Sequence, residues 1–201
     1  MAKIAVDVVL LPSEQTMDWI IEINKELLKQ PPDRIILNKE DCLPHISLAM
    51  GCIDETDVDA IEKTLQSIAE NHSPGQLFVE GIQTGLNGKN EKVALLKLKK
   101  TKQLQSLHEV VMQKLAPYLS YDVSIEMVLS PPTASESTLL WIKHYPEKSS
   151  FENFSPHITL GYGQIENISF ASEFTAPKLS LCHLGNHCTC RKILTSAKFL
   201  G

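Results

Sequence analysis

The sequence of 201 residues has no apolar run of transmembrane length and no excess of positive charge. A helix that crosses a bilayer needs about 20 apolar residues, so we expect no membrane partner. Lysine and arginine number 19 against 24 acidic residues, which leaves a net charge of −5. This balance argues against a broad basic surface that grips long nucleic acid. A nucleotide-sized ligand with a single phosphate remains compatible with it.

Regular cysteine spacing is also missing. The five cysteines follow no disulfide framework, and a chain of this length needs none, so we expect reduced thiols in a cytoplasmic protein. Residues 182–190 hold thiol and imidazole groups that suit zinc, but their spacing is not that of a zinc knuckle. Because Gly185-Asn186 is typical of a hairpin turn, we expect two strand ends there and no metal. The cysteines are Cys42, Cys52, Cys182, Cys188 and Cys190.

A glycine-rich phosphate loop, a low-complexity segment and an interdomain linker are absent as well. The hydrophobic fraction of 43% is that of an ordinary globular protein with a substantial core. The apolar run at residues 4–11 lacks a small-residue cleavage site, so we interpret it as a buried strand and not as a signal peptide. We expect residues 1–201 to form a single two-lobed domain.

Apolar periodicity predicts an α+β order of elements. Helices are expected at residues 13–29, at residues 56–71 and from Thr101 to near Pro117, where apolar residues recur at helical spacing. Residues 146–155 are polar and are expected to form a loop. Strands are expected at residues 4–11, 35–37, 76–83, 92–99, 124–129, 138–143, 174–184 and 191–199, the last two as a hairpin.

One short phrase occurs twice, as LPHISLAMG at residues 43–51 and as SPHITLGYG at residues 155–163. Each copy holds a histidine and, two positions later, a hydroxyl residue. Because side chains alternate between the faces of an extended strand, this spacing places the imidazole and the hydroxyl on one face. The two pairs are His45 with Ser47 and His157 with Thr159.

The same alternation predicts what surrounds each pair. Ala49 and Gly161 would lie on the polar face and leave room beside the hydroxyls, whereas Met50 and Tyr162 would face the core. One copy lies in each half of the chain, and the halves look like a degenerate duplication. We therefore expect two pseudo-symmetric lobes, each a mainly antiparallel sheet with helices packed outside, around a central cleft that holds both His strands.

Two imidazoles with an unperturbed pKa of about 6.5 can act as general base and general acid in one reaction. If the cleft brings the two strands together, the imidazoles flank a reacting centre to which Ser47 and Thr159 donate hydrogen bonds. A phosphodiester under in-line attack requires such a set, because charge on its non-bridging oxygens must be stabilised. The residues therefore predict phosphoryl chemistry that needs no metal and no other cofactor.

The doubled Pro-His-Ile-Ser/Thr-Leu phrase resembles the signature of the two-histidine (2H) phosphoesterase superfamily, in particular the group of 2′-5′ RNA ligases and RNA 2′,3′-cyclic phosphodiesterases. The resemblance covers most of the chain. It implies that His45 and His157 are the catalytic acid and base, and that Ser47 and Thr159 bind the substrate phosphate. Residues 121–154 form a longer segment than in the compact bacterial members, so we expect substrate selection there.

The resulting hypothesis is a hydrolase that opens a phosphodiester next to a ribose hydroxyl, with the 2′,3′-cyclic phosphate of an RNA end or a nucleotide as its leading substrate. The same chemistry on 2′-5′-linked oligonucleotides, cyclic dinucleotides or ADP-ribose cyclic phosphate stays open. A non-catalytic module that binds nucleotides or RNA ends is the alternative of a different class. The sequence does not indicate the oligomeric state, and a monomer is compatible with it.

Further side chains are weaker candidates. Trp141 and Tyr145 are candidates for stacking on a base; the alternative is that they pack on a lobe surface. Lys97, Lys143 and Arg191 are candidates for contact with a phosphate, but lone basic residues on strands are usually solvated, which is the expectation for all three. The histidines at positions 72 and 108 lie on or beside helices and are expected at the surface.

Overall fold

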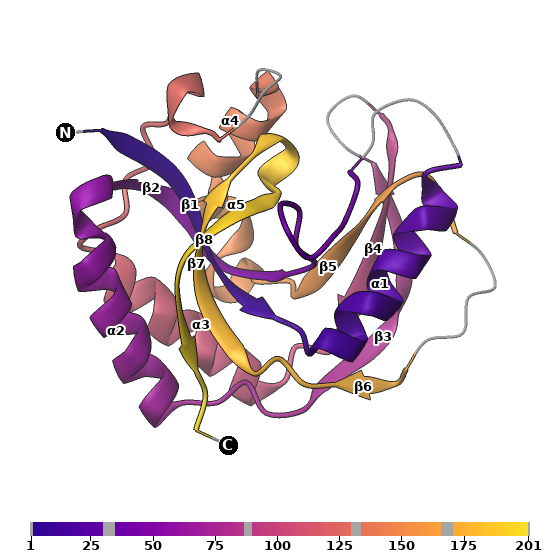
Figure 1. Cartoon of the computed structure of the whole chain (residues 1–201), viewed down its shortest axis with the longest axis horizontal. Coiled ribbons are helices and arrows are strands. Elements are labelled where there is room, and N and C mark those ends of the chain that lie inside the picture. Colours follow the sequence, from indigo (N-terminus) through magenta and orange to yellow (C-terminus); the bar gives the residue numbers. More distant parts are fainter. Residues whose placement is uncertain (1, 30–34, 87–89, 130–133, 166–170, 201) are drawn as a thin grey trace.

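The computed structural model describes residues 2–29, 35–86, 90–129, 134–165 and 171–200 and confirms an α+β architecture with two lobes (Figure 1). Its strands form two four-stranded antiparallel sheets, ordered β2-β1-β7-β8 and β5-β4-β3-β6. The first sheet contains β1 (Lys3–Leu11), β2 (Ile46–Asp54), β7 (Lys178–Leu184) and β8 (Cys190–Lys198). The second contains β3 (Leu77–Leu86), β4 (Lys92–Leu98), β5 (His157–Tyr162) and β6 (Glu173–Phe174).

Each His phrase supplies the edge strand of one sheet. β2 carries the first phrase and β5 carries the second, and each pairs with one inner strand, β1 or β4. The edge strands β2 and β5 contact each other near the centre of the molecule, where the two sheets meet (Figure 1). The fold therefore joins phrases that lie about a hundred residues apart in the sequence.

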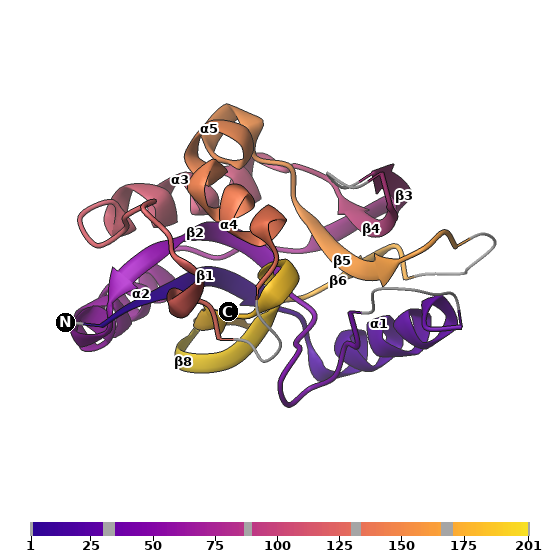
Figure 2. The same ribbon diagram turned by 90° about the horizontal axis from the view of Figure 1, so that it is seen from above.

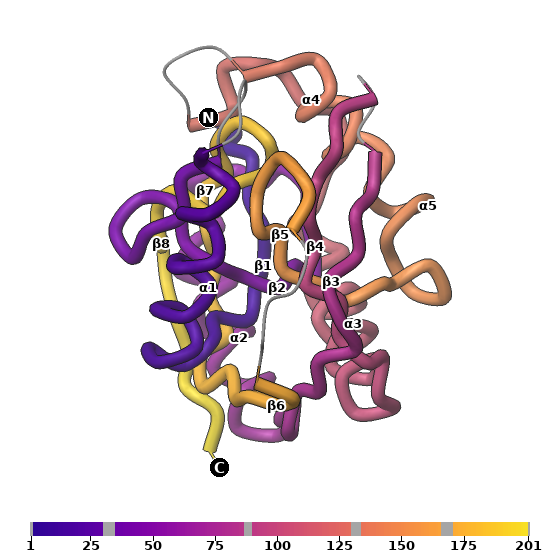
Figure 3. The backbone as a smooth tube through the Cα atoms, turned by 90° about the vertical axis from the view of Figure 1, so that its right-hand side faces the viewer, coloured from indigo at the N-terminus to yellow at the C-terminus, as the bar shows by residue number. Residues whose placement is uncertain are grey.

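The helices exchange partners between the lobes. α1 (Glu14–Leu27) follows β1 of the first sheet but packs against β5, whereas α3 (Lys102–Leu115) follows β4 of the second sheet but packs against β2. α2 (Val58–Asn71) covers β7 and β8. Figure 2 shows α1 beside β5 and β6, with the short helices α4 (Glu136–Lys143) and α5 (Tyr145–Ser149) on the opposite side. Figure 3 shows the same separation of α1 from α5.

The three long helices begin and end close to where the sequence predicts them. The hydroxyl of Ser13 accepts from the Thr16 N–H at the start of α1, and that of Thr101 accepts from the Leu104 N–H at the start of α3. Such caps satisfy N–H groups that have no partner within the helix. Among the described residues, no helix is both long and apolar enough to cross a bilayer.

Between the third long helix and the second His phrase, the sequence-based expectations are wrong. Residues 124–129, expected as a strand, contain a 3-10 turn at Ile125–Met127, and residues 138–143, also expected as a strand, lie in α4. Ser135 decides the second case, because its hydroxyl caps the helix by accepting from Thr138 N–H. Residues 146–155, expected as a loop, include α5 and the 3-10 turn Phe151–Asn153.

Two smaller expectations also change. The strand expected at residues 174–184 is divided into β6 and β7, since Pro177 between them has no N–H to donate to a ladder. Residues 35–37 belong to no strand; the Asn24 side chain holds them by hydrogen bonds to Ile35 O and Leu37 N. The hairpin of β7 and β8 is confirmed.

Candidate functional site

His45, Ser47, His157 and Thr159 line one cavity between the two edge strands. Its volume is about 470 Å³, which lies within the usual size range of small-molecule sites. His157 is the first residue of β5 and His45 immediately precedes β2, and each hydroxyl follows two residues later on the strand. The spacing in the sequence therefore predicted correctly that each strand presents its imidazole and hydroxyl to a shared space.

Each imidazole is anchored in the same way. His45 Nδ1 lies 2.7 Å from the Leu43 carbonyl oxygen, and His157 Nδ1 lies 2.8 Å from the Ser155 carbonyl oxygen. A carbonyl oxygen only accepts, so in both rings Nδ1 carries the proton and donates it. Nε2 is then the nitrogen whose lone pair takes part in proton transfer.

The surroundings disfavour the charged form of both rings. Burial lowers the pKa of His45, and the nearby His157 adds to this effect, while the hydrogen bond to Leu43 opposes it. Burial also lowers the pKa of His157, where the Lys97 ammonium adds to the effect and the Ser155 carbonyl opposes it. Without a ligand, both rings are therefore biased toward the neutral form, and an anion between them would favour protonation.

A β-bulge in each His strand overturns part of the predicted facing pattern. The register shifts in β2 after Ser47 and in β5 after Thr159, so Leu48 and Leu160 are the extra residues. An extra residue reverses the alternation beyond it. As a result, Met50 and Tyr162 line the cavity.

The alternation predicts that Ala49 and Gly161 keep the cavity open beside the hydroxyls. Because of the bulges, this prediction is wrong. Gly161 instead lies against α1, where a Cβ atom would come within 2.9 Å of the Asn24 side-chain nitrogen. Its φ of +138° also favours glycine. Its small size thus serves the packing of the bulge and not the space beside Thr159.

The exchanged helices hold the bulge carbonyls. His108 of α3 donates from Nδ1 to the Leu48 oxygen at 2.8 Å, and Asn24 of α1 donates to the Leu160 oxygen at 2.7 Å. The expectation that His108 lies at the surface is wrong, because its side chain is completely buried. Leu104, four residues earlier on the buried stripe of α3, is the sequence signal that places position 108 on the inner face.

His108 also contacts the segment in front of the second phrase. Its Nε2 accepts from the Phe151 N–H at 2.7 Å, and its ring stacks on Phe154 at a centroid distance of 4.0 Å. Burial lowers the pKa of His108 to about 4, so the ring is neutral at pH 7. One imidazole therefore connects the first His strand to the residues that lead into the second.

The weaker candidates separate into two groups. Trp141, half-exposed at 50%, and the buried Tyr145 line the cavity, as does Lys97, which was expected to be solvated. Lys97 donates to the Ser155 hydroxyl beside His157. Lys143 and Arg191 are not among the described residues that line the cavity. Arg191 bonds instead to the Asp41 carbonyl oxygen at 3.0 Å.

His187 is a site residue that sequence reasoning missed. It lines the cavity from the turn between β7 and β8, and its Nδ1 lies 3.0 Å from the Tyr162 hydroxyl. His187 and Cys188 have φ angles of +58° and +53°, a conformation that is uncommon outside glycine and often marks functional sites. The sequence signal is the His-Cys pair beside the Gly-Asn turn, a segment for which the spacing predicts strand ends and no metal.

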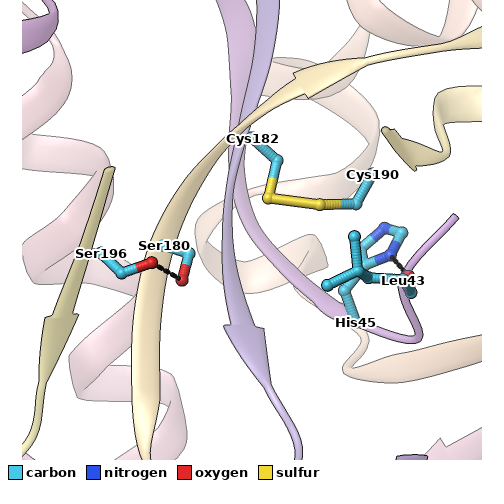
Figure 4. The surroundings of a disulfide bond; sticks show 6 residues. All are labelled: Leu43, His45, Ser180, Cys182, Cys190 and Ser196. Carbon is cyan, nitrogen blue, oxygen red and sulfur yellow. Dashed lines mark hydrogen bonds between the residues drawn. A yellow bond between two sulfur atoms is a disulfide. The ribbon is translucent and has the colours of Figure 1, made fainter. Parts of the chain in front are cut away.

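A disulfide lies behind the first imidazole (Figure 4). It joins Cys182 to Cys190, so the expectation of five reduced thiols is wrong for this pair; the hairpin brings the two Cα atoms to 5.6 Å. The Cys190 carbonyl oxygen accepts from the Leu43 N–H at 3.0 Å, and Leu43 in turn holds His45. Among the described residues, no three histidine, cysteine or acidic side chains are grouped to bind a metal ion.

The family model for the 2′-5′ RNA ligase superfamily matches residues 38–181, a span that includes both His phrases and most of the chain. The chain belongs to the 2′-5′ RNA ligase superfamily. The matched span takes in every cavity-lining residue of both motifs, together with residues 121–154. None of the curated proteins matches the sequence closely enough to count as a relative.

Solved structures share the fold of this superfamily member over its whole length. TT0787 of Thermus thermophilus is 14% identical, with a TM-score of 0.61 over 98% of this chain and 99% of that one. A structure described as a phosphoesterase and the Escherichia coli LigT complex with NADP⁺ are each 13% identical, with TM-scores of 0.53 over the full length of both chains. At 13–14% identity, these similarities show that the chains share a fold.

Proposed function

We propose that the protein is a metal-independent phosphodiesterase that hydrolyses a phosphodiester next to a ribose hydroxyl, with a 2′,3′-cyclic phosphate as the leading substrate. The observation that carries the proposal is the matched placement of His45 and His157. Both present Nε2 for proton transfer and line one cavity with a hydroxyl two residues later. Membership of a superfamily of phosphoesterases supports the reaction class.

Proton transfer by the two rings is sufficient for the reaction. A neutral imidazole accepts a proton from water as the water oxygen bonds to phosphorus. A protonated imidazole donates its proton to the ribose oxygen as the bond between that oxygen and phosphorus breaks. Ser47 and Thr159 donate hydrogen bonds to the non-bridging oxygens, where negative charge accumulates.

Lys97 suggests how the two roles are divided. Its ammonium lies beside His157 and disfavours a positive charge on that ring. We assign the base to His157 and the acid to His45 for this reason. Lys97 also lines the cavity, where its charge would attract the phosphate.

The cavity favours a nucleotide over a longer polymer. Its volume of about 470 Å³ and the half-exposed Trp141 at its edge suit one or two nucleosides, with the indole stacked on a base. The net charge of −5 offers no extended basic surface for duplex nucleic acid. The NADP⁺ complex of Escherichia coli LigT is a case of a similar fold with a bound nucleotide.

The deciding experiment offers four 2′,3′-cyclic nucleotides, short RNAs with cyclic phosphate ends, 2′-5′ oligoadenylates and cyclic dinucleotides, in buffer with a chelator. Phosphorus NMR identifies the bond that breaks. We expect turnover of a cyclic phosphate and a bell-shaped dependence of rate on pH. Turnover restricted to another substrate class would move the assignment to that class, and binding without turnover of any substrate would favour the binding module.

A further inference from the structure

Asp7 is a completely buried carboxyl group beneath the candidate site. It lies on β1, the inner strand of the first sheet, opposite Met50 on β2 and Cys182 on β7. Directly opposite residues of neighbouring strands point to the same face. Met50 lines the cavity, so the side chain of Asp7 lies on the cavity side of the sheet.

The carboxyl group has polar neighbours, but no cation among the described residues acts on its pKa. Neither of its oxygens has a partner at full hydrogen-bond geometry among the described residues. The Ser47 hydroxyl and the Ala49 N–H face it from β2. The titratable groups around it are Tyr145 from α5 and Cys188 from the β7–β8 turn. Burial raises the pKa of both groups, and the nearby carboxyl group adds to the rise.

A negative charge in such a place is strongly disfavoured. Burial raises the pKa of Asp7 to about 8, although Ser47 and Ala49 act against the rise. At neutral pH the side chain is therefore a carboxylic acid with an O–H to donate. Ser47 faces it with a hydroxyl oxygen that is able to accept a hydrogen bond.

The second lobe shows that the fold does not require a carboxyl group at this place. Asp7 pairs with Met50, three residues after the motif hydroxyl; Val93 pairs in the same way with Tyr162, three residues after Thr159. In the second lobe, the apolar side chain of Val93 therefore occupies the position on the inner strand β4 that corresponds to Asp7 on β1. Of these two matched positions, the one beside the first motif carries the carboxyl group.

We propose that Asp7 is a positioning residue for Ser47: its carboxyl O–H donates to Ser47 Oγ and turns the Ser47 O–H toward the substrate phosphate. The proposal rests on the proposed function in that a phosphate is the ligand of the site. When Asp7 loses its proton, the carboxylate instead accepts a hydrogen bond from the Ser47 O–H. Ser47 then presents lone pairs to the phosphate, above a negative charge, and phosphate binding weakens.

Two substitutions separate this role from packing. Asp7→Asn keeps a donor that cannot ionise, whereas Asp7→Val copies the second lobe and removes the donor. At pH 7 we expect kcat/KM of the Asn variant to stay within about threefold of the parent, and that of the Val variant to fall about tenfold, which is the usual effect of one hydrogen bond. Thermal unfolding confirms that each variant is folded at the assay temperature.

A double-mutant comparison tests whether Asp7 acts through Ser47. We expect Asp7→Val to cause no further loss in a Ser47→Ala background but its full tenfold loss in the matched Thr159→Ala background. An equal loss in both backgrounds would overturn the proposal, because the effect would then not pass through Ser47.

Anion binding gives a readout that does not depend on turnover. Inorganic sulfate is a suitable probe, since its charge is constant between pH 6 and pH 10, and calorimetry measures its affinity. We expect an affinity decline above about pH 8 in the parent and in Lys97→Met, and none in Asp7→Asn. A decline that persists in Asp7→Asn would refute the proposal. If no phosphodiester is hydrolysed, the proposed function fails while the sulfate titration still decides the role of Asp7.

Discussion

The two halves of the molecule share a frame and differ in their charges. Each has an edge strand with a His-x-Ser/Thr motif, a bulge after the hydroxyl, and a side chain from an exchanged helix on the bulge carbonyl. On the inner strand of the second half, Lys97 lies opposite His157. In the first half, Leu10 pairs with Ile46, so the next residue of the inner strand, Leu11, is the counterpart of Lys97 beside His45. A symmetric frame therefore positions two equal imidazoles, and the inner strands make their surroundings unequal.

The largest effect should be common to both halves. Replacing either His45 or His157 by Ala removes one of the two proton transfers, so we expect turnover to fall by about 10²–10⁴-fold in each variant. Both side chains are only partly buried, and the fold should survive. Rates on a 2′,3′-cyclic nucleotide, with circular dichroism as the control for folding, check this. A variant with near-parental turnover would end the assignment of its residue.

The carboxyl group of the first half should lower stability at neutral pH. The pKa of Asp7 rises from 3.8 in the unfolded chain to about 8 in the folded one, so stability is lost as pH rises through this window. At pH 7 the loss amounts to about 4 kcal/mol, as an upper limit. We expect Asp7→Asn to raise the free energy of unfolding at pH 7 and to leave it nearly unchanged at pH 3.5.

The matched substitution in the second half is Val93→Asp, which adds a carboxyl group at the place that corresponds to Asp7. Val93 is only partly buried, so the loss of stability should be smaller than that caused by Asp7. Urea unfolding of both variants at the two pH values is the measurement. An Asp7→Asn variant that is less stable than the parent at pH 7 would contradict the burial argument.

The two bulge contacts should respond differently to acid. Burial lowers the pKa of His108 from 6.5 to about 4, so the stability it contributes is present above pH 6.5 and is lost as pH falls toward 4. The full loss is about 3 kcal/mol. Asn24 does not titrate. We expect His108→Gln to flatten the dependence of stability on pH between 4 and 6.5, and Asn24→Ala to lower stability by about 2 kcal/mol at every pH.

Denaturant unfolding at a series of pH values distinguishes the two contacts. If the Asn24 variant loses acid sensitivity as the His108 variant does, the acid response lies elsewhere in the molecule. If neither variant changes stability at pH 7, the carbonyls of Leu48 and Leu160 find other donors.

The smallest effect should come from the cation of the second half. The Lys97 ammonium lowers the pKa of His157, so Lys97→Met should raise that pKa. We expect the acidic limb of kcat/KM to move to higher pH in Lys97→Met and to stay in place in Leu11→Met, the matched change in the first half. A shift of equal size in both variants would show that packing, and not charge, causes it.

The sequence predicted the site better than the segments around it. His and hydroxyl residues two positions apart lie on one face of any regular strand, so the four motif residues could be assigned before their strands were paired. Met50 and Tyr162 were misplaced because a bulge depends on the partner strand and leaves no mark in the alternation. Helix α4 was misread as a strand because a short apolar run does not distinguish the two, and the cap at Ser135 decides between them.

By itself the sequence determined the long helices, most of the strands and the two His-x-Ser/Thr pairs, because periodicity and spacing are local properties of the chain. Only the tertiary structure decided that α1 and α3 exchange lobes and that His108 is buried beneath one motif. It also decided that Asp7 lies opposite Met50, whereas Val93 lies opposite Tyr162. These facts follow from strand register and helix docking, which join residues far apart in the chain. Burial then sets the charge state of each group.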